Sequence, residues 1–219
     1  ADTVRLRLSE ANRKAGLTLD ETWVGPGESS AIAVISSIPG VNAVSATRFL
    51  ELEATTESEP SRIKYARAVT LLRAGATEGR FMNRLPVSVS RELPLTVDLS
   101  AVETEVQPGR KLALSLKHNL KAGTLKADAI IEFPNVPTGI KAPSAVVENG
   151  SASALIKLQI PDKLPAGRYS LVALVKATVI SEPDEAQSKA KTVPKEQALR
   201  VWSNAVSFRV IPKPAAPGK

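Results

Sequence analysis

The sequence predicts an all-β protein built from two tandem antiparallel β-sandwiches. Three observations support this prediction. Apolar residues recur at every second position in many short runs, proline and glycine separate the runs, and one turn-and-strand motif occurs twice. Alternation is typical of strands that bury one face, because successive side chains of a strand point to opposite faces. Short strands at close spacing with such breaks predict a sandwich or a barrel.

The composition supports the same fold class. Hydrophobic residues make up 43% of the chain but aromatic residues only 4%, so the cores must consist of valine, leucine, isoleucine and alanine. Valine- and isoleucine-rich segments favour strands, and sixteen prolines argue against long helices. The alternation is clearest in residues 4–8, 95–100, 111–116, 153–160 and 206–210.

The repeated motif is a Pro-Gly turn placed before an apolar run. It occurs as "VGPGESSAIAV" over Val24–Val34 and as "VQPGRKLALSL" over Val106–Leu116. Proline presets a negative φ and glycine supplies a positive φ, so each pair predicts a type II turn that starts a strand. The offset between Pro26 and Pro108 also separates the flanking valines and glycines, which predicts an internal duplication. The alternative is that Pro-Gly before a strand recurs by chance.

The duplication and the turns predict the boundaries. We expect one sandwich over residues 1–92, a second over residues 93–213, and a linker tail over residues 214–219. Proline stiffens the short linker at Arg91–Pro94.

Two local features of the second half carry their own predictions. Asn149-Gly150 predicts a two-residue hairpin turn in which both residues have positive φ. Residues 181–203 are charged and predict a long excursion between strands, with one or two helical turns after a capping box formed by Ser181 and Asp184.

The region from "FPNVPTGIKAP" to "PAGRYSLVALV" resembles the bacterial immunoglobulin-like repeats of large exported proteins, notably those of planctomycete-type bacteria. The matching residues are Pro108-Gly109, Val136 to Ile140, Asn149-Gly150 and Pro165 to Val172. The resemblance covers Leu93–Pro212, and the first half matches only at its Pro-Gly-led strand and at "LPVSVS". It implies two immunoglobulin-like sandwiches that serve as spacer or adhesion modules outside the cytoplasm, in the periplasm, at the cell surface or secreted. The family carries no catalytic residues.

Composition limits the chemistry that the chain can perform. There is no cysteine, which removes thiolate nucleophiles, cysteine-ligated zinc and iron–sulfur clusters. No apolar run reaches the ~18 residues that span a bilayer, so we expect no membrane-spanning segment. The net charge of +7 permits an anionic partner. Nucleic-acid binding would require aromatic residues among the basic ones, and only Tyr65 qualifies, so we expect no nucleic-acid partner.

Few side chains are candidates for a site. The single histidine, His118, is expected in a solvated loop after a strand. Glu51 and Glu53 share a predicted strand face and could reach one hard cation or a sugar, although we expect a solvated strand face, because a cation loop or a glycosidase pair normally draws its ligands from several segments. Trp23 and Trp202 could stack on a sugar, or could pack in a core or a domain interface. We expect no metal and no cofactor.

The sequence therefore predicts a non-enzymatic structural, spacer or presentation module of a larger exported or surface protein. Its expected partners are the other domains of that protein, with a polysaccharide or another surface protein as further possibilities. The alternative is an accessory carbohydrate-binding module of a secreted hydrolase. A periplasmic pilus chaperone, which also has two immunoglobulin-like domains, is a third candidate. Exposure of the tryptophans discriminates the first two, because a solvent-facing indole beside a groove favours sugar binding and buried indoles favour a spacer.

Overall fold

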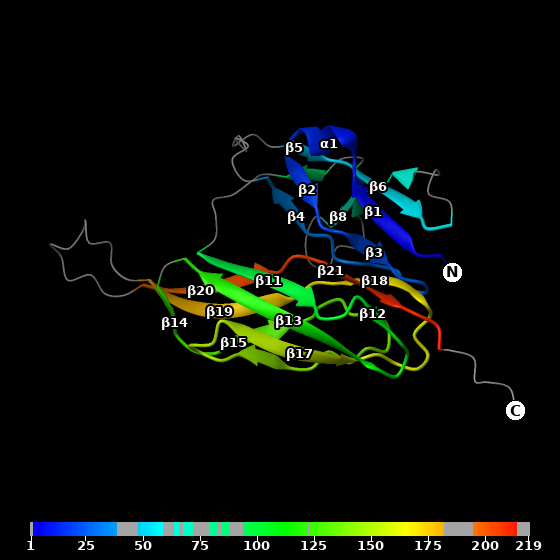
Figure 1. Cartoon of the computed structure of the whole chain (residues 1–219). Coiled ribbons are helices and arrows are strands. Elements are labelled where there is room, and N and C mark those ends of the chain that lie inside the picture. The colour runs from blue at the N-terminus through cyan, green and yellow to red at the C-terminus, as the bar shows by residue number, and fades with distance from the viewer. Residues whose placement is uncertain are drawn as a thin grey trace, which may run out of the picture.

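The computed structural model describes residues 2–38, 48–58, 64–65, 68–71, 79–82, 85–87, 94–121, 123–181 and 195–213. These residues form an all-β structure with several antiparallel sheets, as the alternation predicted (Figure 1). The one helix among them is the single turn α1 (Glu10–Lys14). None of the described helices is long and apolar enough to cross a membrane. The predicted boundary at residues 92–93 and the tail at 214–219 lie outside the described residues.

The N-terminal part, by which we mean the described residues of 2–87, consists of short strands. A sheet of order β3-β1-β6-β7 forms its centre, and the pairs β2-β4, β5-β10 and β8-β9 accompany it. Leu8, Leu17 and Leu50 form a small core, against which Leu19, Ile35 and Leu52 pack. The strands are β1 (Val4–Leu8), β2 (Leu17–Leu19), β3 (Thr22–Val24), β4 (Ile35–Ser37), β5 (Arg48–Leu50), β6 (Leu52–Thr56), β7 (Lys64–Tyr65), β8 (Ala68–Leu71), β9 (Gly79–Met82) and β10 (Leu85–Val87).

The helix α1 was not predicted, although its sequence explains it. The Ser9 hydroxyl caps the helix by accepting from the Asn12 amide at 3.4 Å. Glu10 and Lys14 form an ion pair one turn apart, with their charges placed as the helix dipole favours. Buried Asn12 ties the helix to the chain between β5 and β6, because its side chain donates to the Phe49 carbonyl and accepts from the Glu51 amide.

The C-terminal part, residues 94–213 as described, has two layers around one large core, an arrangement that fits a β-sandwich. One layer is the sheet β11-β13-β17, and the other contains β12-β21-β18 and the five-stranded sheet of β14, β15, β16, β19 and β20. The strands are β11 (Leu95–Ala101), β12 (Glu105–Val106), β13 (Lys111–Leu120), β14 (Thr124–Leu125), β15 (Ala129–Glu132), β16 (Ala145–Val147), β17 (Ser153–Gln159), β18 (Gly167–Leu171), β19 (Leu174–Ser181), β20 (Lys195–Trp202) and β21 (Val206–Val210).

Alternation decides which side chains enter this core. In β11, Leu95, Val97 and Leu99 are buried while the residues between them are exposed. Leu114 and Leu116 of β13 are fully buried, and they meet Tyr169 and Phe208 from the opposite layer in one cluster. Each buried leucine contributes about 2 kcal/mol through apolar burial, so this alternation accounts for much of the folding energy.

Both predicted Pro-Gly turns are confirmed. Gly27 and Gly109 have φ values of 82° and 80°, and each turn is closed by a 3.1 Å backbone hydrogen bond, from Glu28 N to the Gly25 carbonyl and from Arg110 N to the Gln107 carbonyl. The strands that follow differ. The second turn leads into the ten-residue strand β13, whereas β4 begins only at Ile35 and has three residues. The two halves therefore share a turn but not the strand after it.

The Asn149-Gly150 prediction is wrong in two respects. Gly150 has a φ of 92°, but no non-glycine residue of the described chain has a positive φ, so Asn149 does not adopt the predicted conformation. The turn closes through the Ser151 amide and the Glu148 carbonyl at 2.9 Å. The flanking strands do not pair with each other, because β16 pairs with β15 and β17 pairs with β13. The turn joins the two layers of the sandwich instead of forming a hairpin.

The predicted excursion over residues 181–203 is too long. Residues 195–202 form strand β20, which pairs with β19 along its whole length, from Ser181 opposite Lys195 to Leu174 opposite Trp202. The buried residues Leu199 and Val201 alternate with exposed ones. The sequence "QALRVW" shows this period of two, but the many charged residues of the segment led to the prediction of a loop. Residues 182–194, with Asp184 of the capping box, lie outside the described residues.

Candidate functional site at the junction of the two parts

The N-terminal and C-terminal parts meet where β3 lies beside β18 (Figure 1). The Trp23 amide donates to the Ser170 hydroxyl at 2.8 Å, and that hydroxyl donates to the Glu21 carbonyl at 3.2 Å. Ser170 is buried, so both of its hydrogen bonds are made away from water. The Ser170 side chain thus supplies the hydrogen bonds that a neighbouring strand would otherwise make with the backbone of β3.

Gly25 and Tyr169 form the closest contact of the junction. A β-carbon on Gly25 would lie 2.1 Å from two ring carbons of Tyr169. Any residue other than glycine at this position would therefore require the ring or the backbone to move. The Tyr169 ring stacks on Phe208 with centroids 5.6 Å apart, and its hydroxyl donates to the Pro165 carbonyl at 2.8 Å. Burial, with a smaller contribution from the carboxylate of Glu28, raises the pKa of Tyr169 to about 12.

Trp23 is contacted by two guanidinium groups, one from each part of the chain. Arg5 of β1 is 5.3 Å from the indole centroid and Arg168 of β18 is 5.1 Å from it, both within the range of cation–π attraction. Each arginine has a carboxylate partner, Glu21 at 3.5 Å and Glu57 at 3.4 Å. The Arg168–Glu57 contact is an ion pair without hydrogen-bond geometry, since the buried Nε of Arg168 has no hydrogen-bond acceptor in the described structure.

Further hydrogen bonds surround this centre. The Asp20 carboxylate accepts from the Ala205 amide at 2.8 Å, and the Glu21 carboxylate accepts from the Ser207 hydroxyl at 2.7 Å. Beyond the Pro-Gly turn, the Glu28 carboxylate accepts from the Thr138 amide at 2.7 Å. The segment 20–28 therefore bonds to three separate stretches of the C-terminal part, and this spread resists rotation about any single contact.

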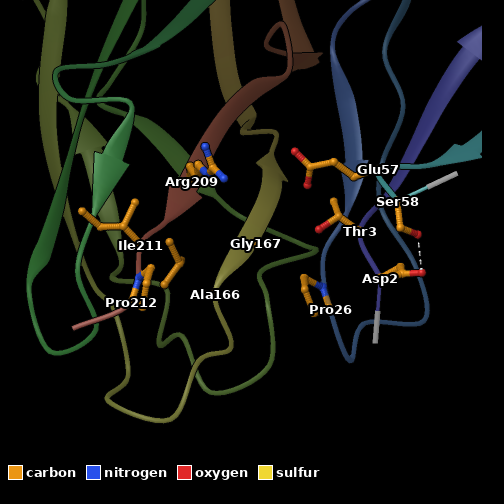
Figure 2. Close-up of a pocket in the computed structure, with 11 residues that line it drawn as sticks. Asp2, Thr3, Pro26, Glu57, Ser58, Ala166, Gly167, Arg209, Ile211 and Pro212 are labelled. Atoms are coloured by element: carbon orange, nitrogen blue, oxygen red, sulfur yellow. Dashed lines mark hydrogen bonds between the residues drawn. The ribbon is translucent and has the colours of Figure 1, made fainter. Parts of the chain in front are cut away.

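A cleft of about 390 Å³ opens beside the junction. Figure 2 shows Glu57, Ser58, Asp2 and Thr3 on the N-terminal side and Arg209 on the other, with Gly167 between them. The Ser58 hydroxyl donates to the Asp2 carboxylate at 2.8 Å. A β-carbon on Gly167 would lie 2.5 Å from the Pro26 ring, so two residues that line the cleft also form a close approach between the two parts. The shape of the cleft therefore depends on the junction.

The structure separates the two predicted tryptophans. Trp23 is only 6% exposed and belongs to the junction, as the interface alternative for this residue predicted. Its indole Nε1 is buried without a hydrogen-bond partner in the described structure. Trp202, by contrast, is 46% exposed at the end of β20. The exposure test thus gives a different answer for each tryptophan.

Only Glu53 of the predicted carboxylate pair lies within a strand, so Glu51 and Glu53 do not share the predicted strand face. Glu51 is at the bend between β5 and β6, where its amide is held by Asn12. Glu53 is in β6 opposite Arg7 of β1, and it lines a cavity of about 760 Å³ together with Arg5, Arg7 and Arg13. Among the described residues no group of three or more His, Cys, Asp or Glu side chains could hold a metal ion.

His118 lies in strand β13 and not in the predicted loop. It is half-buried, and its Nε2 is 2.8 Å from the Ser151 carbonyl. The short run of polar residues after Leu116 suggested a loop, but β13 continues through it because its partner β11 extends equally far. The ring therefore has a structural contact at the rim of the sandwich.

Sequence reasoning missed most of the junction. Ser170 and Arg168 belong to the segment that carries the family resemblance, but their partners in β3 are far away in the sequence. The nearest signal was Gly25 directly before the Pro-Gly turn, since a glycine that the turn itself does not require often marks a close approach of another chain segment.

No protein-family model and no curated protein matches the chain. Among solved structures, a protein of unknown function from Porphyromonas gingivalis W83 is similar over part of its length, with 15% sequence identity and a TM-score of 0.33. The similar region covers 57% of this chain and 51% of that chain. A similarity this low supports no conclusion about the function of either protein.

Proposed function

We propose that the chain is a non-enzymatic structural or presentation module, built from immunoglobulin-like sandwiches, that holds its two parts in a fixed orientation. The junction carries this proposal. It combines a buried tryptophan contacted by two arginines, a glycine against a tyrosine ring and hydrogen bonds to three separate stretches. Domains that move freely share small polar contacts, whereas this junction adds a close backbone–ring contact and a buried indole to its hydrogen bonds.

Two details of the C-terminal part support the immunoglobulin-like assignment. The Tyr169 hydroxyl donates to a carbonyl four residues upstream, which is the arrangement of the tyrosine corner in immunoglobulin-like domains. Strand β12 pairs in parallel with the last strand, β21, while every other pairing among the described strands is antiparallel. Consecutive strands β11 and β12 thus belong to different layers, and the immunoglobulin-like fold is compatible with a first strand that is divided in this way.

The setting follows from the resemblance of Leu93–Pro212 to exported repeats. We propose an extracytoplasmic location and, as partners, the neighbouring domains of a larger surface or secreted protein. A rigid junction suits such a role, because a spacer transmits a defined distance and direction only when its units do not rotate against each other.

Distance measurements between two spin labels test the proposal. The chain has no cysteine, so Lys14→Cys in α1 and Lys157→Cys in β17, both exposed, would be the only labelled positions. Double electron–electron resonance should give one narrow distance distribution. Replacing Ser170 and Arg168 together by alanine should broaden it, because these changes remove both hydrogen bonds of the Ser170 hydroxyl and the cation–π contact with Trp23.

Ser153→Ala is the matched control, since Ser153 is exposed on β17, in a sheet that contains neither β3 nor β18. It should leave the distribution narrow. A broad distribution in the unmodified chain would show that the junction does not fix the orientation, and the structural proposal would then be wrong.

A second candidate function rests on a different residue. The 46% exposure of Trp202 meets the first condition for the accessory carbohydrate-binding module, a solvent-facing indole, but Trp202 lines none of the described clefts. An exposed indole offers an apolar face and a polar edge to a sugar ring. Titration with a panel of soluble polysaccharides tests this function, and loss of binding in Trp202→Ala is the expected result. The two functions use separate surfaces and can coexist in one module.

A further inference from the structure

The outer face of the sheet that contains β15, β19 and β20 carries an unusual set of side chains around Trp202. Strand pairing places Trp202 opposite Leu174, which lies opposite Glu132. The next row runs from Arg200 through Lys176 and Ile130 to Val146. Directly paired residues of antiparallel strands project to the same face, so these two rows form one continuous surface. Trp202, Ile130 and Val146 are each about half exposed on it.

The basic side chains on this face differ in whether a carboxylate pairs with them. Lys176 binds the Glu132 carboxylate, and Lys126 binds the Glu196 carboxylate at 2.7 Å. Arg200 is exposed and has no carboxylate partner among the described residues. The face therefore presents the Arg200 guanidinium, unpaired among the described residues, two positions from the exposed indole on the same side of β20.

The spacing of these two side chains matches one kind of ligand. Residues two apart on a strand are about 6.8 Å apart, so an aromatic platform and a cation face outward side by side. A guanidinium binds a carboxylate with two parallel hydrogen bonds, and an indole covers the apolar face of a ring. A sugar ring that carries a carboxylate can make both contacts at once.

We propose that Trp202 and Arg200 form a binding site for an acidic polysaccharide, in which Trp202 stacks on a uronic acid ring and Arg200 binds its carboxylate. This inference rests on the second candidate function and specifies its ligand class. The site lies on an open sheet face and lines neither the junction cleft nor the cavity at Glu53, which suits an extended polymer better than a small molecule. The net charge of +7 favours the approach of such a polymer.

The test is a calorimetric titration of the whole chain with polygalacturonate, and with dextran as a neutral polymer. The unmodified chain should bind polygalacturonate and show no heat with dextran. Trp202→Ala and Arg200→Gln should each weaken binding about tenfold, as expected for the loss of a stacking or a charge-assisted contact. Circular dichroism melting checks that both variants are folded, and the exposure of both residues predicts that they are.

Arg110→Gln is the matched control. It removes the same charge from an exposed position in the turn before β13, and it should change the affinity less than about twofold. An equal loss in Arg110→Gln and Arg200→Gln would show diffuse attraction to a cationic protein and would overturn the site. Binding of dextran as tight as that of polygalacturonate would overturn the acidic ligand but keep the carbohydrate-binding function. Absence of binding to both polymers would overturn the site as well.

Discussion

Gly25 and Tyr169 approach so closely that a β-carbon on Gly25 would lie 2.1 Å from Cδ1 and Cε1 of the tyrosine ring. Gly25 has no positive φ, so the space and not the backbone conformation requires glycine here. The Tyr169 ring cannot retreat easily, because it stacks on Phe208 and its hydroxyl is bound to the Pro165 carbonyl. The Gly25 backbone and the Tyr169 ring therefore join the two parts of the chain directly.

Gly25→Ala should therefore destabilise the protein by about 1–3 kcal/mol, the usual cost of overpacking a buried contact. The midpoint of urea denaturation measures the change. In a Tyr169→Leu background the same substitution should cost much less, because the smaller side chain leaves room for the new methyl group. Equal costs in the two backgrounds would mean that Gly25 matters for a reason other than the Tyr169 ring.

The two Pro-Gly turns allow a matched comparison of backbone strain. Gly27→Ala and Gly109→Ala should each cost about 1–2 kcal/mol, because both glycines have φ near 80° and L-residues are disfavoured there. Nothing lies within 4 Å of a β-carbon on Gly27, whereas one on Gly109 would lie 2.6 Å from the Asp162 carboxylate. Asp162 is exposed and can rotate away, so we expect similar costs in urea denaturation.

Asp162→Ala provides the control for this comparison. If the Asp162 contact were costly, the double variant Gly109→Ala/Asp162→Ala would recover stability relative to Gly109→Ala alone. An unchanged denaturation midpoint in both Gly27→Ala and Gly109→Ala would show that the turns tolerate other residues and that the positive φ does not require glycine.

The features that could be predicted from the sequence are local. The all-β class, the two Pro-Gly turns and the buried faces of β11, β13 and β21 each depend on residues a few positions apart. Periodicity and turn chemistry report such local relationships directly.

The features that were missed depend on pairing partners. β16 and β17 flank an Asn-Gly turn but join different layers, and β20 follows a charged segment yet pairs with β19. The junction depends on contacts between segment 20–28 and β18, which no pattern within either segment specifies. Of the predicted site residues, the sequence could name Trp23 and Trp202, but only burial distinguishes the interface residue from the exposed one.

Glu51 and Glu53 provide a prediction about metal dependence. A chelator should leave the thermal unfolding temperature unchanged, because the Glu51 backbone is anchored by Asn12 and Glu53 lies opposite Arg7, a cation that competes with any metal ion. Differential scanning calorimetry with and without chelator measures this. A decrease of several degrees that added calcium reverses would instead identify a cation site at these carboxylates.

The buried hydroxyl of Tyr169 should make stability depend on pH in the alkaline range. Its pKa is raised from 10.0 to about 12 in the folded protein, chiefly by burial and secondarily by Glu28, so the folded state keeps the proton over a range in which the unfolded state has lost it. The folded state therefore binds more protons between pH 10 and about 12, and the free energy of unfolding falls as the pH rises through this range. The contribution is fully present below pH 10.

Tyr169→Phe isolates this effect, because it retains the ring against Gly25 and Phe208 but has no ionisable proton. Urea denaturation of both proteins at several alkaline pH values measures the stability of each. Between the two pKa values, the unmodified chain should lose about 2–3 kcal/mol of stability relative to Tyr169→Phe. All other ionisable groups are common to both proteins, so their effects cancel in the difference. Glu28→Gln should reduce the shift, since it removes the negative charge that disfavours tyrosinate. A stability difference that stays constant with pH would mean that the hydroxyl ionises as easily in the folded protein as in the unfolded chain. Tyr169 would then not be closely packed at the junction.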